Sequence, residues 1–119
     1  MNILYIEDEP LDAQLVGRYL QTTHHKLIYI NSLDNVRDAL QVAPDLILMD
    51  VMLNNVKSGY DFVVDLRRSG YTLPIIAVTG LALPEDIERC FRVGFTDVLA
   101  KPFTLKQLAA MLNDYANRE

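Results

Sequence analysis

The sequence holds a single cysteine, Cys90, so an internal disulfide bond is impossible and a reducing compartment is favoured. Long apolar runs are also missing, since none approaches the roughly 20 residues that a membrane-spanning helix requires. The first residues show neither a basic segment nor a small-residue cleavage site, so no secretory signal is expected. These absences together predict a soluble cytoplasmic protein.

Basic residues are outnumbered as well. The chain has 11 Lys and Arg against 16 Asp and Glu, whereas binding to a nucleic-acid backbone depends mainly on basic side chains. We therefore expect no direct nucleic-acid binding. Internal repeats, low-complexity tracts and Gly/Ser-rich linkers are absent too. With 119 residues, 50% of them hydrophobic, the sequence predicts one domain over residues 1–119 around one core.

What the sequence does contain is a regular alternation of two hydrophobic patterns. Short apolar runs of strand length lie at Ile3–Ile6, Leu27–Ile30, Leu46–Met49, Ile75–Val78 and Val98–Ala100. Segments with helical spacing follow each of them, and their expected core-facing residues are Leu11, Leu15, Val16, Leu20, Val36, Ala39, Leu40, Phe62, Val63, Leu66, Ile87, Phe91, Leu105, Leu108, Leu112 and Tyr115. Gly94 is expected to end the fourth helix, and Thr104 with Gln107 has the spacing of a capping box before the fifth.

Five strands that alternate with five helices predict a parallel sheet covered by helices on both faces. The strand segments are apolar on both sides instead of alternating, as burial from both faces requires. We expect the doubly wound, flavodoxin-like (βα)5 arrangement of the α/β class, with the strand order 2-1-3-4-5. In such a sheet, binding sites form beyond the carboxyl ends of the strands, near the point where the strand order reverses.

Polar residues follow four of these strands directly. They are Glu7 and Asp8 after the first strand, Asp50 after the third, Thr79 after the fourth, and Lys101 and Pro102 after the fifth. The expected strand order makes the first, third and fourth strands neighbours, with the fifth beside the fourth. Three carboxylates, one hydroxyl and one ammonium should therefore meet at one edge of the sheet.

Carboxylates gathered at one edge repel one another, because two of them about 4 Å apart cost about 4 kcal/mol at an effective dielectric constant of about 20. Lys101 supplies one positive charge, so an excess of negative charge remains that a hard cation with oxygen ligands, such as Mg²⁺, would balance. Taken alone, Glu7 and Asp8 also suit the acidic start of a helix, and Asp50 suits a capping residue. Asp50 lies between apolar stretches, however, where a carboxylate is costly unless it has partners.

With these residues in place, the sequence resembles the receiver domain of bacterial response regulators over essentially the whole chain. The matching segments are Ile6–Glu9, Pro44–Asp50, Pro74–Gly80 and Leu99–Phe103. Each segment alone is a weak signal. Their joint order, and their placement at the ends of strands, is highly specific.

The resemblance implies roles for the acidic residues. Asp50 would be the phosphoacceptor, a carboxylate nucleophile that forms an aspartyl-phosphate. Asp8 would be the main Mg²⁺ ligand, with Glu7 acting through water. The backbone carbonyl of Met52 would complete the protein's metal ligands.

The resemblance also implies that Thr79 hydrogen-bonds one phosphoryl oxygen and that Lys101 pairs with another, with Pro102 following through a cis peptide bond. Such sites work largely by positioning and by neutralising charge on the phosphoryl oxygens. The phosphoryl donor would be a phosphohistidine on a sensor histidine kinase or a phosphotransfer protein, and a downstream effector domain or protein would read the result. The domain would catalyse only its own phosphorylation and dephosphorylation.

The position three residues before Lys101 departs from the family's pattern. Family members carry there an aromatic residue that swings inward on phosphorylation, whereas this chain has Val98. The mechanism of the phosphorylation switch is therefore an open point. Phe95 or Phe103 could substitute, although packing is the simpler interpretation of both.

The segment after Asp50 departs as well. The family usually has Pro at the fourth following position and Gly at the eighth, whereas this chain has Asn54 and reaches Gly59 at the ninth. A loop one residue longer, of turn-forming composition, is predicted beside the site.

Three other functions share parts of this pattern. A flavodoxin-like cofactor binder would need a phosphate cradle after the first strand, where Glu7 and Asp8 would repel phosphate. A phosphatase with an aspartyl nucleophile would need a second acid where this chain has Met52. A receiver-like module that docks partners without phosphorylation is the main alternative, because of Val98 and the longer loop.

Overall fold

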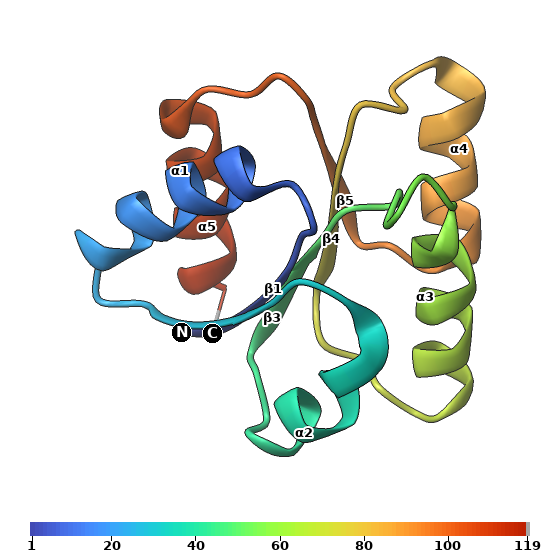
Figure 1. Ribbon diagram of the computed structural model, residues 1–119, viewed down its shortest axis with the longest axis horizontal. Helices are drawn as coiled ribbons and strands as arrows, with labels where there is room; N and C mark the ends of the chain where they lie inside the picture. The colour runs from blue at the N-terminus through green and yellow to red at the C-terminus, as the bar shows by residue number, and fades with distance from the viewer. Residues whose placement is uncertain (119) are drawn as a thin grey trace.

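The computed structural model describes residues 1–118 and shows strands that alternate with helices along the chain (Figure 1). The strands are β1 Asn2–Ile6, β2 Lys26–Ile30, β3 Leu46–Met49, β4 Ile75–Thr79 and β5 Asp97–Ala100. The helices are α1 Pro10–Gln21, α2 Val36–Gln41, α3 Ser58–Arg68, α4 Pro84–Val93 and α5 Leu105–Ala116, with a short 3₁₀ turn at Leu33–Asn35. Every predicted strand is confirmed to within one residue at either end.

The strands form one parallel sheet in the order β2-β1-β3-β4-β5, which confirms the predicted doubly wound α/β fold. From β1 the chain moves outward to β2, then crosses to β3 on the other side of β1 and continues to β4 and β5. The strand order therefore reverses between β1 and β3. The carboxyl ends of these two strands are where a binding site is expected.

Helices cover both faces of the sheet. Figure 1 shows α1 and α5 on one face and α2, α3 and α4 on the other. The buried side chains divide accordingly: Leu48 packs in one cluster with Val16 and Leu112, whereas Ile47 packs in the other with Val63. Successive side chains of a strand point to opposite faces of the sheet. Because helices cover both faces, β3 and β4 are buried along their whole length. This double burial explains why their sequences do not alternate.

Local sequence sets where the helices begin and end. The Thr104 hydroxyl accepts the Gln107 N–H at 3.1 Å and the Gln107 side chain accepts the Thr104 N–H at 2.8 Å, which confirms the capping box of α5. Gly94 ends α4 as predicted, with a φ of 122° that favours glycine. At α1 the cap is Glu9, whose side chain accepts the Leu11 N–H at 2.8 Å. Glu7 and Asp8 are thus not needed as caps.

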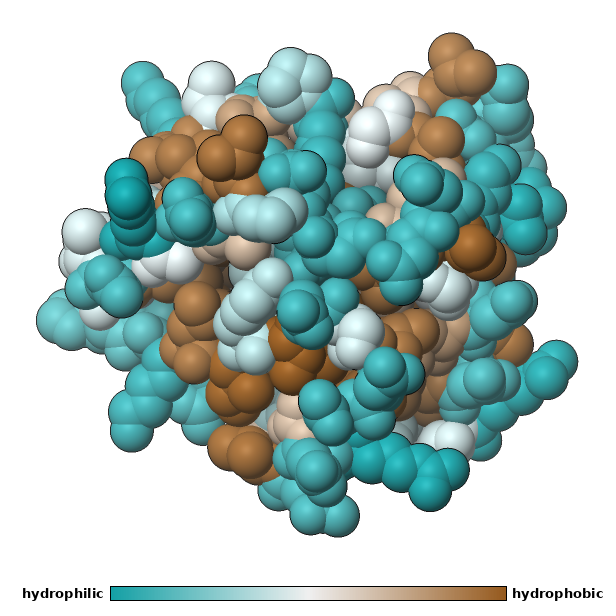
Figure 2. All heavy atoms as spheres, in the orientation of Figure 1, coloured by the Kyte–Doolittle hydropathy of each residue, from teal (hydrophilic) through white to brown (hydrophobic). Residues whose placement is uncertain are grey.

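Four side chains that were predicted to face the core are exposed instead: Leu11 (74%), Leu15 (43%), Phe91 (51%) and Leu105 (37%). Helix α1 begins beyond the end of β1, so its first turns extend past the sheet, and the buried side chains are those of Val16 and Leu20. In α4 the inward position belongs to the fully buried Cys90. Figure 2 shows hydrophobic atoms at the surface over α1 and at the upper end of α4. Within residues 1–118, no helix has the length and apolar character to cross a bilayer.

Candidate functional site

The carboxyl ends of β1 and β3 bring three acidic residues together. Glu7 and Asp8 follow β1, and Asp50 follows β3, where its N–H donates to the Ile6 carbonyl at 3.1 Å. One carboxylate oxygen of each acid lies within 4.8 Å of the other two. Glu7 is fully buried and Asp50 is only 7% exposed, whereas Asp8 is half-buried. We call Glu7, Asp8 and Asp50 the acid cluster.

Lys101 reaches the acid cluster from the end of β5, with β4 lying between β5 and β3. Its Nζ lies 2.6 Å from Glu7 Oε1 and 3.1 Å from Asp50 Oδ2. Its backbone N–H donates to the Thr79 carbonyl at 2.8 Å, and the Lys101–Pro102 peptide bond is cis. The ammonium group of Lys101 therefore bridges two members of the cluster.

A fourth carboxylate, Asp12, also contacts this ammonium group, with 3.0 Å between Asp12 Oδ2 and Lys101 Nζ. Asp12 was not predicted from the sequence, because it lies within α1 and does not directly follow a strand. Asp12 lies in the first turn of α1, and α1 begins beside the acid cluster. An acidic residue in the first turn of a helix that starts at the binding edge was the available signal.

Burial and charge repulsion shift the ionisation of these groups. Burial raises the pKa of Glu7 to about 7, and the neighbouring Asp50 adds to this rise while Lys101 opposes it. Burial alone would lower the pKa of Lys101, but the carboxylates of Glu7, Asp12 and Asp50 outweigh burial and raise it. Lys101 is therefore charged at physiological pH. Within residues 1–118 it is the one ammonium group in contact with these carboxylates.

The donor atoms of the acid cluster fit a hard divalent cation. The three carboxylates of the acid cluster, together with that of Asp12, outnumber the one ammonium group of Lys101, so negative charge is in excess. Mg²⁺ is held in proteins by a small number of carboxylates together with water and phosphoryl oxygens. Glu7, Asp8 and Asp50 therefore have the chemistry to hold it. The Met52 N–H donates to Asp50 Oδ1 at 3.1 Å, which places Met52 beside the cluster, and a metal-ligand role for its carbonyl stays a prediction.

Thr79 lies fully buried at the end of β4, paired across the sheet with Ala100. Its hydroxyl oxygen accepts the Leu81 N–H at 3.0 Å. Within residues 1–118, this hydroxyl makes no hydrogen bond to the acid cluster or to Lys101. The structure thus places Thr79 at the expected edge of the sheet but not in contact with the acids.

The loop after Asp50 is a tight hairpin. Leu53 and Val56 exchange two backbone hydrogen bonds, of 2.9 and 3.0 Å, across a turn in which Asn54 and Asn55 have φ values of 52° and 61°. Two consecutive residues with positive φ are typical of a two-residue type I′ turn, in which asparagine is well tolerated. The predicted turn-forming composition therefore corresponds to a defined turn.

Comparison with known proteins identifies the family. Residues 3–113 match the family model described as the response regulator receiver domain. This chain belongs to the receiver domain family. Receiver domains act as phosphoacceptors in two-component signalling, so the resemblance proposed from the sequence is confirmed together with the fold.

Relatives of this receiver domain are parts of longer proteins. It is 37% identical to the sensor histidine kinase RcsC of Salmonella typhi over 99% of the chain, which spans 12% of RcsC. It is 29% identical to the transcriptional regulatory protein MalR of Bacillus subtilis over 100% of the chain and 52% of MalR. The receiver domain of Klebsiella pneumoniae RstA, crystallised in a BeF3-activated form, has a TM-score of 0.86 at 25% identity, with 97% of each chain covered. Such domains therefore occur both in kinases and in regulators.

The side of this receiver domain around Val98 differs from the family's pattern. Val98 is half-buried and packs against the cluster shared with α3 and α4. Phe95 is 3% exposed in the same cluster, whereas Phe103 packs half-buried on the opposite face of the sheet. Because a β-branched side chain has restricted χ1 freedom, Val98 cannot perform a large inward swing. Both phenylalanines occupy packing positions.

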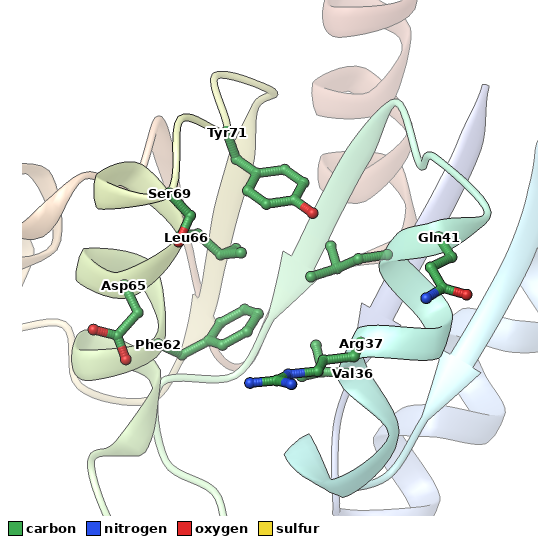
Figure 3. A pocket seen from close by; sticks show the side chains of 9 residues that line it. Val36, Arg37, Gln41, Phe62, Asp65, Leu66, Ser69 and Tyr71 are labelled. Carbon is green, nitrogen blue, oxygen red and sulfur yellow. The ribbon is translucent and has the colours of Figure 1, made fainter.

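A groove of about 610 Å³ lies away from the acid cluster, between α2 and α3 (Figure 3). Phe62, Leu66 and Tyr71 point into it from one side, and Val36 and Arg37 from the other. The charged residues that line the groove are Asp65 on α3 and Arg37 on α2. The groove therefore lacks the convergent charged groups that distinguish the edge of the sheet.

Proposed function

We propose that Asp50 accepts a phosphoryl group in a Mg²⁺-dependent reaction and thereby switches the binding of a signalling partner. The observation that carries this proposal is the contact of the Asp50 carboxylate with Lys101 inside a cluster of acids that fits a divalent cation. A carboxylate this deeply buried needs such partners, and their arrangement serves phosphoryl transfer.

In the proposed reaction, an Asp50 carboxylate oxygen attacks the phosphorus atom of a phosphohistidine. A bond forms between this oxygen and phosphorus, and the phosphorus–nitrogen bond breaks with its electron pair passing to the imidazole. Mg²⁺, when bound by Glu7, Asp8 and Asp50, supplies positive charge for the phosphoryl oxygens. Lys101 pairs with one of these oxygens.

Thr79 completes the proposed site. Its hydroxyl, which accepts the Leu81 N–H in this structure, donates a hydrogen bond to a phosphoryl oxygen. Leu81 lies in the segment between β4 and α4 and is bonded to this hydroxyl. Reorientation of the Thr79 side chain toward the phosphoryl group would therefore shift the β4–α4 segment. Phosphorylation changes the state of the domain itself, and later hydrolysis of the aspartyl-phosphate restores the original state. No external substrate is turned over.

The phosphoryl donor is a sensor histidine kinase or a histidine phosphotransfer protein, and the reader of the switched state is an effector domain or protein. The donor must reach Asp50 from solvent. Beside the acid cluster lies a hollow of about 310 Å³ lined by Asp12, Leu15, Lys101, Pro102 and Phe103. Its apolar side chains, Leu15 and Phe103, support docking of a donor protein next to Lys101.

The test is incubation with acetyl phosphate and Mg²⁺ followed by intact-mass analysis. One added phosphoryl group on the wild-type protein is expected, with none on Asp50→Asn and none when Mg²⁺ is chelated. Docking without phosphorylation is the second candidate, because Val98 does not offer an aromatic switch. The absence of any adduct, with both acetyl phosphate and a phosphorylated histidine protein, would contradict the proposed function and favour that alternative.

A further inference from the structure

The turn beside the acid cluster makes a direct bond to one of the acids. The backbone N–H of Asn54 donates to Asp8 Oδ2 at 2.7 Å. The residue at this position, four after the phosphoacceptor, is usually proline in receiver domains, and proline has no N–H to donate. This hydrogen bond is thus open to the present chain and closed to members that carry the usual proline.

The turn has the rigidity to hold such a donor in place. Its two ends, Leu53 and Val56, are joined by a pair of backbone hydrogen bonds, and the Leu53 side chain is only 4% exposed. Beyond the turn, the Gly59 N–H donates to the Val51 carbonyl at 2.9 Å. A Cβ atom at Gly59 would lie 2.7 Å from Val51 Cα, so glycine is required where the loop closes.

Asp8 is the member of the acid cluster that most needs such support. Glu7 and Asp50 are buried and contact Lys101, whereas Asp8 is half-buried and makes no ion pair within residues 1–118. Repulsion from the other two carboxylates favours rotation of its side chain into water. The charge-assisted bond from Asn54 opposes that rotation and occupies one carboxylate oxygen, leaving the other for a ligand.

We propose that the Asn54–Asn55 turn is a positioning element that holds the Asp8 carboxylate in the geometry required to bind a divalent cation. The identity of the cation as Mg²⁺ rests on the proposed function. The turn acts through its backbone, since the donor is a main-chain N–H and the positive φ values orient it. The asparagine side chains matter only because they tolerate this conformation.

Two double variants separate the backbone from the side chains. Asn54→Gly with Asn55→Gly removes both side chains and keeps positive φ accessible, whereas Asn54→Val with Asn55→Val removes the same side chains and disfavours positive φ. We expect calorimetric titration of the full chain with Mg²⁺ to give nearly unchanged affinity for the glycine variant. The valine variant should bind roughly tenfold more weakly, which is the lower end of the loss expected for a hydrogen bond to a charged group.

A metal-free measurement accompanies the titration. The residue-54 amide should be protected from hydrogen exchange in the wild type and the glycine variant, and unprotected in the valine variant. If the valine variant does not fold, an ester in place of the Asn54 peptide N–H removes the donor alone and should weaken Mg²⁺ binding similarly. Equal affinity in all proteins, or tighter binding when the donor is lost, would overturn the proposal.

The titration also separates this inference from the proposed function. Turn-dependent Mg²⁺ binding in a protein that neither acetyl phosphate nor a phosphorylated histidine protein can label would contradict the function and leave the positioning role standing. Labelling of Asp50 together with Mg²⁺ binding that ignores the turn would contradict the positioning role alone.

Discussion

Two regions of this receiver domain differ in how closely they follow the family's pattern. At the ends of β1 and β3, the acid cluster and Lys101 form a connected set of charged groups, with distances of 2.6 and 3.1 Å from the ammonium nitrogen to Glu7 and Asp50. At β5, Val98 stands in place of an aromatic residue and packs against the core. The charged groups of the site therefore match the family's pattern, whereas the residue at the aromatic position does not.

The difference has a physical origin. Each charged group of the site depends on the others, because a buried carboxylate without its cation is strongly destabilising. Val98 has no such dependence, since it is an apolar residue in place of an aromatic one, and its contribution to stability comes from packing against the core. Substitutions in the charged region should therefore have larger effects than a substitution at Val98.

The largest effect is expected at Asp8. Asp8→Asn removes a charged ligand from the acid cluster, so Mg²⁺ affinity should fall roughly a hundredfold or more, since even partners that only support ligands contribute 10–100-fold. Calorimetric titration measures this. Glu9→Gln is the matched control, because Glu9 is exposed, loses the same charge and keeps an oxygen for capping α1. Equal losses in both variants would show that net charge alone attracts the cation.

The next effect concerns stability. Lys101→Met removes the cation that contacts Glu7 and Asp50, so the free energy of unfolding without Mg²⁺ should fall by about 3 kcal/mol. Urea denaturation in a chelator measures the change. Arg92→Met breaks an exposed pair with Glu88 on α4 and should cost less than about 0.5 kcal/mol. Similar losses in the two variants would contradict the central place of Lys101.

Over any one pH unit, a smaller effect follows from Glu7, whose pKa burial raises from its usual 4.5 to about 7. Between these two values the folded chain retains a proton that the unfolded chain has lost. Stability without Mg²⁺ should therefore decrease as pH rises through this window, by up to about 1.4 kcal/mol per pH unit. Urea denaturation at each pH gives the free energy of unfolding of the wild type and of Glu7→Gln. The wild-type value minus the Glu7→Gln value should fall as pH rises. A difference that stays constant or grows with pH would exclude the raised pKa.

The smallest effect is expected at Val98. Val98→Tyr introduces the family's usual aromatic residue at a position that packs against the hydrophobic core and not among the charged groups. The rate of labelling by acetyl phosphate should therefore change by less than about twofold. Time-resolved mass analysis measures this rate, with Val98→Ile as the packing control. A change of about tenfold in the tyrosine variant alone would show that the two regions are coupled, contrary to the comparison drawn above.

Much of the fold and of the charged region follows from the sequence. Runs such as Leu46–Met49 are apolar on both sides, which only a doubly covered strand explains, and the strand order then brings their polar ends together. That rule alone predicts that Glu7, Asp8, Asp50 and Lys101 meet at one edge of the sheet. It works because the positions of strand ends depend on topology and not on side-chain detail.

The features that could not be predicted from the sequence are side-chain positions that depend on helix orientation and a hydrogen bond made by the backbone. Periodicity assigned Leu11 and Phe91 to the core, but the exposure of a helical residue depends on how far the helix extends past the sheet and how it is rotated. The contact of Asp12 with Lys101 depends on the same orientation. The bond from Asn54 to Asp8 involves a main-chain N–H, which every residue except proline has, so residue type did not reveal it.

The central claim is that residues from four strand ends form one site for a divalent cation and a phosphoryl group. The most direct measurement is a crystal structure with Mg²⁺ and beryllium fluoride, whose trifluoride stands in for the phosphoryl group. We predict the ion about 2.0–2.1 Å from oxygens of Asp8 and Asp50, with the fluoride on Asp50 contacting Lys101 and Thr79. An ion bound elsewhere, or an Asp50 carboxylate that carries no fluoride while Lys101 stays on Glu7 and Asp12, would contradict the account.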